Sequence, residues 1–395
     1  MRRNGSRHSL SMTSTSGNRR WSSGTLRGIA AIVWLAIMSA TLWPFNPVPH
    51  NDVSWLPQAN GIHFGKRGLV LSSHDFPATA PSEGHPYSLE ISLRPIDETD
   101  QHPFLTFYLP DRPRALELRQ WGHFLVIFCR ERDTHGHVSS AEIDVVHVFQ
   151  RGKAVWLTVT SGPRGASVYL NGELVQSASG FHLPENAFAG ELVLGSSPTT
   201  YDPWSGDVFT LALYRSELSA VQVRQHFQAG IPKGVSPEDL QNAVAVYGFT
   251  EHDGPTIHND VANAPWLTVP AHFQVPHKPM LLVPWKEITH DRAYVDDVAR
   301  NIVGFVPLGI AVYLYFLRRR QSNAAMLTIL LGFATSLTIE IVQAYIPQRF
   351  SGMTDIITNG SGTALGVLLL QPRAIRIILE RWDVLETPEA GATQG

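Results

Sequence analysis

Four apolar segments, three of them crowded at the C-terminal end, constrain this 395-residue chain more than any other feature. At about 1.5 Å per helical residue, the first segment spans roughly 27 Å, which is enough to cross a thin bilayer core. A long polar region separates it from the other three. The four segments cover residues 28–45, 302–317, 324–346 and 356–370.

The flank of the first segment allows two interpretations. Residues 1–26 contain no acidic residue and are rich in serine and threonine, which predicts a disordered basic arm. A secretory signal peptide cleaved near Ala40 would have a similar basic flank. The length of the segment and its end at Trp43-Pro44-Phe45 favour a retained transmembrane helix over 27–46, with aromatic rings at the interface. The basic residues of the arm are Arg2, Arg3, Arg7, Arg19 and Arg20.

Short strands with turns between them fill residues 50–275. Residues 87–93 alternate with period two, as a half-buried strand does. Asn171-Gly172 is the dipeptide best suited to a type I′ hairpin turn. One helical excursion is expected over 219–229. Many short strands predict an extracytoplasmic antiparallel sandwich, and the other candidate strands are 154–160, 166–170, 191–195, 207–214 and 244–249.

Candidate ligand residues in this region are weak. Cys129 is the single cysteine and lies in an apolar run, so we expect a buried, inert thiol and no internal disulfide. His135-Gly136-His137 lacks nameable third and fourth metal ligands, so no metal site is predicted. Core packing is favoured for Trp156, whose strand pattern points it inward. The remaining weak candidates for sugar or calcium contact are Trp121, Asp202, Trp204 and Asp207.

Arginine clusters predict the topology of the helices. Arg318, Arg319 and Arg320 follow the second apolar segment, and further arginines follow the fourth. Placing every cluster in the cytosol puts the sandwich and the loop 347–354 outside. We therefore expect a juxtamembrane linker over 276–300, helices 2–4 over 301–372 and a cytosolic tail over 373–395. The fold class is multi-domain: a four-helix transmembrane bundle with an inserted all-β sandwich.

Polar residues gather at one depth in these helices. A carboxylate near the bilayer centre costs on the order of 2.5 to 3.5 kcal/mol, so it needs a partner or a polar pocket. Helical rise places the cluster in the outer third of the spans. The candidate ligand-binding residues are Asp297, Asn301, Glu340, Gln343, Arg349, Asp355 and Asn359.

Two interpretations of the polar cluster stay open. The residues either hold the helices in register or form one pocket open to the outer leaflet. The excess of carboxylates over cations favours the pocket. Gly362 and Gly366 are spaced for close helix packing, and Pro307 would loosen its helix.

The order and spacing of these residues resemble the VanZ-like family over about 295–370. The resemblance rests on Asp297 followed by Asn301 to Gly309 (NIVGFVPLG), on Ser336, Glu340 and Gln343, and on Arg349 to Asn359 followed by Gly362 and Gly366. The family is named for a member implicated in resistance to the glycopeptide teicoplanin. The resemblance implies a place in the bacterial envelope and names no reaction.

The middle region is similar to laminin-G-like or concanavalin-like jelly rolls over about 60–270. The similarity rests on VWLTVT at residues 155–160, on the YLNG hairpin at 169–172 and on FTLALYR at 209–215. It implies a fold and names no ligand. An insertion of this size separates the chain from a simple VanZ protein, and function does not transfer directly.

These patterns predict a non-catalytic protein of the bacterial inner membrane. Its partners would be the bilayer, a lipid-linked cell-wall precursor or glycan, and a protein partner of the sandwich. No cofactor is expected, and a net charge of -3 gives no reason to expect nucleic acid. The alternative is a membrane enzyme using Glu340, Asp355 or Asp297 as general acid or base on a lipid-linked substrate.

Overall fold

The chain divides into a helical unit and a sandwich unit. The computed structural model describes residues 21–78, 86–132, 137–230, 241–288, 292–382 and 384–385. The helical unit comprises Met1–Phe45, Met280–Ala344 and Phe350–Gly395, and the sandwich unit comprises Asn46–Pro279 and Tyr345–Arg349. The arginines of the basic arm and the first two residues of the His135-Gly136-His137 turn lie outside the described residues.

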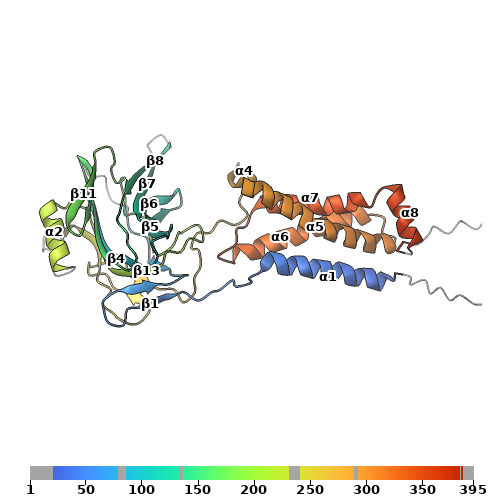
Figure 1. Ribbon diagram of the computed structural model, residues 1–395, viewed down its shortest axis with the longest axis horizontal. Helices are drawn as coiled ribbons and strands as arrows, with labels where there is room; N and C mark the ends of the chain where they lie inside the picture. Colours follow the sequence, from blue (N-terminus) through green and yellow to red (C-terminus); the bar gives the residue numbers. More distant parts are fainter. Residues whose placement is uncertain are drawn as a thin grey trace, which may run out of the picture. The chain divides into compact units, whose positions relative to one another are not determined.

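Two eight-stranded sheets build the sandwich unit (Figure 1). Their pairings are antiparallel throughout. The first sheet has the order β1 (Val53–Trp55), β2 (Ile62–Phe64), β13 (Gly206–Tyr214), β4 (Tyr87–Pro95), β9 (Val155–Gly162), β10 (Gly165–Leu170) and β11 (Glu173–Ala178), with β14 (Ala243–Tyr247) on β13. The second has the order β15 (Thr256–Ile257), β16 (Leu267–Thr268), β3 (Val70–Ser72), β12 (Glu191–Leu194), β5 (Pro103–Leu109), β6 (Arg112–Trp121), β7 (Phe124–Arg132) and β8 (Val138–Val145).

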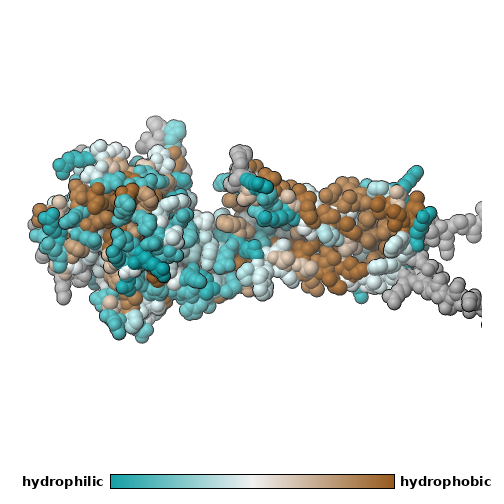
Figure 2. Space-filling view, in the orientation of Figure 1, coloured by the Kyte–Doolittle hydropathy of each residue, from teal (hydrophilic) through white to brown (hydrophobic). Residues whose placement is uncertain are grey.

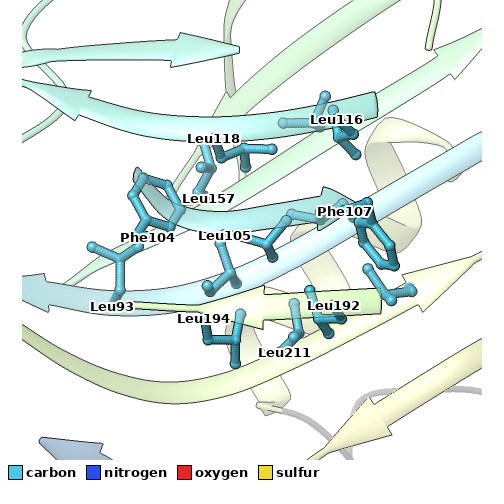
Figure 3. Close-up of a cluster of buried hydrophobic side chains, with 14 of the residues drawn as sticks. Leu93, Phe104, Leu105, Phe107, Leu116, Leu118, Leu157, Leu192, Leu194 and Leu211 are labelled. Atoms are coloured by element: carbon cyan, nitrogen blue, oxygen red, sulfur yellow. The ribbon is translucent and has the colours of Figure 1, made fainter. Parts of the chain in front are cut away.

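Alternating side chains from both sheets form one hydrophobic core. Leu93 and Leu211 from the first sheet meet Phe104, Leu105 and Leu194 from the second (Figure 3). Each is fully buried, and the consecutive residues Phe104 and Leu105 both reach the core where the β5–β6 register shifts between Pro103 and Leu105. The expected antiparallel sandwich is thus observed, and it is consistent with a jelly roll.

The turn predicted at Asn171-Gly172 joins β10 to β11. Asn171 has φ +52° and Gly172 has φ +81°, and both values are positive as a type I′ turn requires. Leu170 pairs directly with Glu173, so the loop holds two residues. The expected hairpin is confirmed.

Helix α2 (Ala220–Ala229) covers the face of the first sheet that points away from the main core. Ser219 caps it, accepting from Gln222 N in a capping box. Beneath α2, a second small core contains Trp156 and Tyr214. Trp156 is buried, but it lies in this second core, because Leu157 is the β9 residue that points between the sheets.

The helical unit holds α1 (Ser23–Leu42), α4 (Pro284–Glu287), α5 (Arg292–Arg318), α6 (Ala324–Ala344), α7 (Met353–Leu369) and α8 (Arg373–Arg381). Within the described residues, α1, α5 and α6 are each long and apolar enough to span a membrane. Together α7 and α8, bent by 71° at their break, give a fourth candidate span. Figure 2 shows a broad apolar surface over these helices, as lipid-facing helices require.

Helix boundaries differ from those expected. Helix α5 begins at Arg292, inside the segment 276–300 assigned to a linker, so Asp297 and Asn301 are helical. Residue Pro307 lies inside α5, which continues through it to Arg318. The first helix is shifted to Ser23–Leu42 and begins where the Ser22 hydroxyl accepts from Thr25 N at 3.0 Å.

Helices α5 and α7 approach closely at small residues. A Cβ atom added at Gly362 would lie 2.1 Å from the Ile302 carbonyl oxygen. At Gly366 it would lie 2.4 Å from the Val306 carbonyl oxygen, and at Gly309 2.2 Å from that of Thr363. The Gly-xxx-Gly pair therefore lies directly against α5, as such pairs do where helix backbones are in contact.

Candidate functional site

A line of polar side chains connects α5, α6 and α7. Asn301 Nδ2 on α5 donates to Asp355 Oδ1 on α7 at 2.7 Å. Asn359 Nδ2, one turn further along α7, donates to Ser336 Oγ on α6 at 2.9 Å. The Ser336 hydroxyl lies 3.4 Å from the Asp355 carbonyl oxygen. Three of the seven predicted site residues thus form one hydrogen-bonded group, together with Ser336.

Glu340 and Gln343 hold backbone groups at the end of α6. Glu340 is only 1% exposed, and its Oε2 accepts the Gly352 N–H at 2.8 Å. Its carbonyl oxygen accepts from Ser351 Oγ at 2.8 Å. Gln343 Nε2 donates to the Thr41 carbonyl oxygen at the end of α1, at 2.9 Å. These contacts fix the α6–α7 turn and connect it to α1.

Asp297 pairs with a neighbour on its own helix, and Arg349 belongs to the sandwich unit. Asp297 accepts from Arg300 Nη1 at 2.9 Å, and the two side chains are 66% and 74% exposed. Arg349 belongs to the segment Tyr345–Arg349 of the sandwich unit, where its N–H donates to the Ile346 carbonyl oxygen. The membership of both residues in one binding pocket stays a prediction.

A cavity of about 400 Å³ opens beside the polar group, between α1 and α5. Asn301 and Asn359 line it, together with Arg300 and Thr41. Helical rise separates Arg300 from Pro307 by about 10 Å, and Thr41 from Val33 by about 12 Å. The cavity therefore has a polar end and an apolar end. Its apolar lining consists of Val33, Ala36, Ile37, Ala40, Gly304, Phe305 and Pro307.

Sequence reasoning missed Glu287 and Arg300. Glu287 on α4 accepts the N–H groups of Met353 at 2.9 Å and Thr354 at 3.2 Å, and so caps α7. A Cβ at Gly352 would lie 2.4 Å from Glu287 Oε1. Glu287 is far from α7 in the chain, so no local pattern indicated this cap. Arg300 lies one helical turn after Asp297, and this i, i+3 spacing was the sequence signal that could have indicated their ion pair.

Three of the four weak candidates of the sandwich have partners inside the domain, and the fourth, Trp121, is exposed. Asp207 accepts from Arg94 Nε at 2.7 Å and pairs with His63 Nδ1 at 2.7 Å. Asp202 pairs with His102 and accepts from Arg119 Nη2 at 2.9 Å. Trp204 is fully buried and donates to Gln120 Oε1 at 2.8 Å.

Cys129 and the histidine turn are the remaining candidate residues of the sandwich. Cys129 lies in the main core, where burial raises the pKa of its thiol to about 11. Among the described residues, no group of three or more His, Cys, Asp or Glu side chains is arranged to hold a metal ion. His137, the described end of the proposed histidine turn, belongs to no such group.

Comparison with protein families gives two matches, one in each unit. Residues 258–376 match the family model described as VanZ/LLP1. Residues 109–224 match the model described as the concanavalin A-like lectin/glucanases superfamily. A comparison with curated proteins gave no match.

Solved structures give remote likenesses. The binding domain of botulinum neurotoxin DC in complex with rat synaptotagmin II is 12% identical, with a TM-score of 0.34, and the match covers 46% of this chain and 45% of that one. The binding domain of botulinum neurotoxin serotype D is 14% identical, with a TM-score of 0.34 and coverage of 47% and 46%. The match thus spans less than half of each of these solved chains. The chain is a membrane protein that joins a VanZ-like helical segment to a concanavalin-like jelly-roll domain.

Proposed function

We propose that this protein is a non-catalytic envelope protein whose helical unit binds an amphipathic, lipid-linked ligand. The observation that carries the proposal is the cavity between α1 and α5, with polar residues at one end and apolar residues at the other. An acyl or prenyl chain matches the apolar end. A phosphorylated head group is a natural ion-pair partner for the exposed guanidinium of Arg300. The surface ion pair between Arg300 and Asp297 is weak, so a phosphate group can replace Asp297 as the partner.

Asn359 adds a second argument for a ligand at the polar end. It is 4% exposed, and its Oδ1 has no hydrogen-bond partner among the described residues. A buried acceptor without a partner costs about 1–3 kcal/mol, so a donor from a ligand or a water would stabilise it. The carboxylates of Glu340 and Asp355 already accept from Gly352 N and Asn301 Nδ2. These contacts favour binding over the alternative, in which they serve as general acid and base on a lipid-linked substrate.

The proposed setting is the bacterial inner membrane, crossed by a four-helix bundle formed by α1, α5, α6 and the α7–α8 pair. Arg318, Arg319 and Arg320 would lie in the cytosol with the C-terminal tail, and the sandwich outside, where it binds glycan or a protein partner. The cavity would then open toward the outer leaflet. A link to glycopeptide resistance rests on the family resemblance and stays a prediction.

Native mass spectrometry of the protein released from its membrane tests this proposal. We expect a retained lipid with a phosphorylated head group, and Arg300→Gln should weaken its retention. Arg373→Gln is the matched control, because Arg373 is also exposed but lies on α8. Absence of bound lipid, or equal retention in both variants, would contradict the proposal.

A further inference from the structure

A groove on the sandwich unit has the composition of a ligand site. It has a volume of about 550 Å³ and lies on β6, β7 and β8. The core-facing residues of these strands alternate with the groove residues, so Leu118, Ile127 and Ile143 point into the sandwich. The opposite face carries the lining: Arg114, Arg119, Trp121, Phe124, Val126, Glu142 and Asp144.

Strand register arranges the groove in rows. Arg119 pairs with Val126, which pairs with Asp144. Trp121 pairs with Phe124 in the next row of the hairpin. These two rings are 49% and 41% exposed, which is unusual for adjacent aromatic residues on a rigid sheet. They form an apolar platform at one end of the groove.

Buried acids hold the arginines of the groove in place. Glu117 is 1% exposed and accepts from Arg114 Nη2 at 2.8 Å and from Arg119 Nε at 3.1 Å. Arg119 also donates to Asp202 at 2.9 Å, and Arg114 stacks over the Phe128 ring at 4.1 Å. The two guanidiniums are thereby fixed, and their charges are balanced by Glu117 and Asp202.

Two neighbouring carboxylates are among the residues that line the groove. Glu142 and Asp144 are exposed residues on the same face of β8. Within the described part of the chain, no basic side chain forms an ion pair with either. Partial burial, and then the neighbouring Asp144, raise the pKa of Glu142, as two close like charges do. A cationic group entering the groove would relieve this repulsion.

We propose that this groove binds a saccharide that carries protonated amino groups. The rings of Trp121 and Phe124 offer flat apolar faces to a pyranose ring, and the carboxylates accept from hydroxyl and ammonium groups. The adjacent carboxylates of Glu142 and Asp144 disfavour uronic acids and phosphorylated ligands. The proposal rests on the proposed role of the sandwich in glycan binding, and it names the surface and the ligand chemistry.

Calorimetric titration of the full-length protein in lipid nanodiscs tests the site at mildly acidic pH. The probes are a glucosamine oligosaccharide, its N-acetylated counterpart and oligolysine. We expect the glucosamine oligosaccharide to bind more tightly than the neutral one. Trp121→Ala should weaken both sugars at least about tenfold, as loss of a central aromatic does. Trp266→Ala is the matched control, because Trp266 is 48% exposed elsewhere on the sandwich unit, and it should change neither.

The double variant Glu142→Gln, Asp144→Asn should bind both sugars equally. It removes the two negative charges that favour the ammonium groups and keeps the shape of the groove. Equal binding of both sugars by the wild type, or sugar binding unaffected by Trp121→Ala, would overturn the site and leave glycan binding elsewhere intact. Oligolysine that displaces the sugar and binds the Trp121→Ala variant as tightly as the wild type would overturn the saccharide in favour of a basic peptide. Failure of every sugar to bind would overturn the glycan role as well, without affecting the lipid cavity.

Discussion

At the scale of single residues, the buried acid Glu340 forms hydrogen bonds that stabilise a backbone turn. Its carboxylate accepts the Gly352 N–H in the α6–α7 turn, and its carbonyl accepts from Ser351. The turn itself is held to the chain before α4, because Leu282 N donates to the Ser351 carbonyl oxygen at 3.0 Å. The Glu340 side chain thus acts as the hydrogen-bond acceptor of a buried backbone N–H group.

Glu340→Ala is expected to destabilise the helical unit by about 1–3 kcal/mol, because it leaves the buried Gly352 N–H without its acceptor. Glu340→Gln keeps an oxygen that can accept this hydrogen bond, and should lie close to the wild type. Thermal unfolding in detergent measures both. If Glu340→Gln were as destabilised as Glu340→Ala, the charge itself would be the stabilising feature and this assignment would be wrong.

The pairing of His102 with Asp202 is expected to make the stability of the sandwich depend on pH. Its hydrogen bond to Asp202 raises the pKa of His102, so the folded state binds the proton more tightly than the unfolded state. The resulting stabilisation is fully present below the unfolded pKa of about 6.5 and is lost as pH rises through the raised folded value. The difference in thermal midpoint between wild type and His102→Gln should therefore be larger at about pH 5 than at about pH 9. A difference that grows with pH would contradict the pairing.

At the scale of elements, periodicity predicted six of the sixteen strands in the described residues, together with the apolar segments that became α1, α5, α6 and α7. Residues 87–93 and 207–214 became β4 and β13 because their alternating side chains have a core on one face. Strand β6 was not predicted, because Arg112, Arg114, Glu117 and Arg119 interrupt the apolar pattern of its sequence. The structure pairs these charges on the outer face, while Leu116 and Leu118 enter the core.

The polar cluster was predicted only in part, for a related reason. Depth along a helix follows from counting residues, and it correctly suggested that Asn301 and Asp355 are close. The direction of each side chain around its helix depends on which helices pack together, which counting does not give. Asp297 points to solvent, whereas Glu340 points to the Gly352 backbone.

Close contact between α5 and α7 predicts the effect of small substitutions. Gly362→Ala would place a Cβ 2.1 Å from a backbone oxygen, so the helices must separate. We expect a loss of about 1–3 kcal/mol, as overpacking causes. Gly28→Ala on α1 is the control, because nothing lies within 4 Å of its added Cβ, and it should be neutral. Thermal stability in detergent distinguishes the two, and equal stability would contradict the tight contact.

At the scale of the whole molecule, the two units have separate cores. The main core of the sandwich draws its residues from 62 to 267, all within the sandwich unit. The helical cores draw theirs from α1, α5, α6, α7 and α8. Separate cores are the usual condition for independent folding.

Residues 46–279, cut free of the helices, are therefore expected to form a soluble, monomeric β-sandwich. Its one cysteine is buried, so reducing agent should change nothing. Circular dichroism with and without reductant, together with the mass in solution, measures this. A helical or unfolded spectrum would show that the sandwich depends on the helical unit.

The topology is a further property of the whole chain. Single-cysteine labelling at positions 230, 321 and 350, in a chain with Cys129 replaced by Ala, reads it directly, because Phe350 is an exposed residue of the α6–α7 loop. Reagent outside the cell should label 230 and 350 and spare 321, because the arginines before position 321 hold that loop in the cytosol. Labelling of 321 from outside would reverse the predicted orientation.

The cavity between α1 and α5 is the central claim, and filling it is the most direct test. Gly304 lines the cavity, and a Cβ added there meets nothing within 4 Å, so Gly304→Phe should fold and occupy the ligand's place. Gly28→Phe adds the same ring to α1 at a position equally free of neighbours. Mass spectrometry of lipid retained by the two purified variants is the measurement. We predict that Gly304→Phe loses the phosphorylated lipid while Gly28→Phe keeps it, and equal retention by two folded variants would contradict the account.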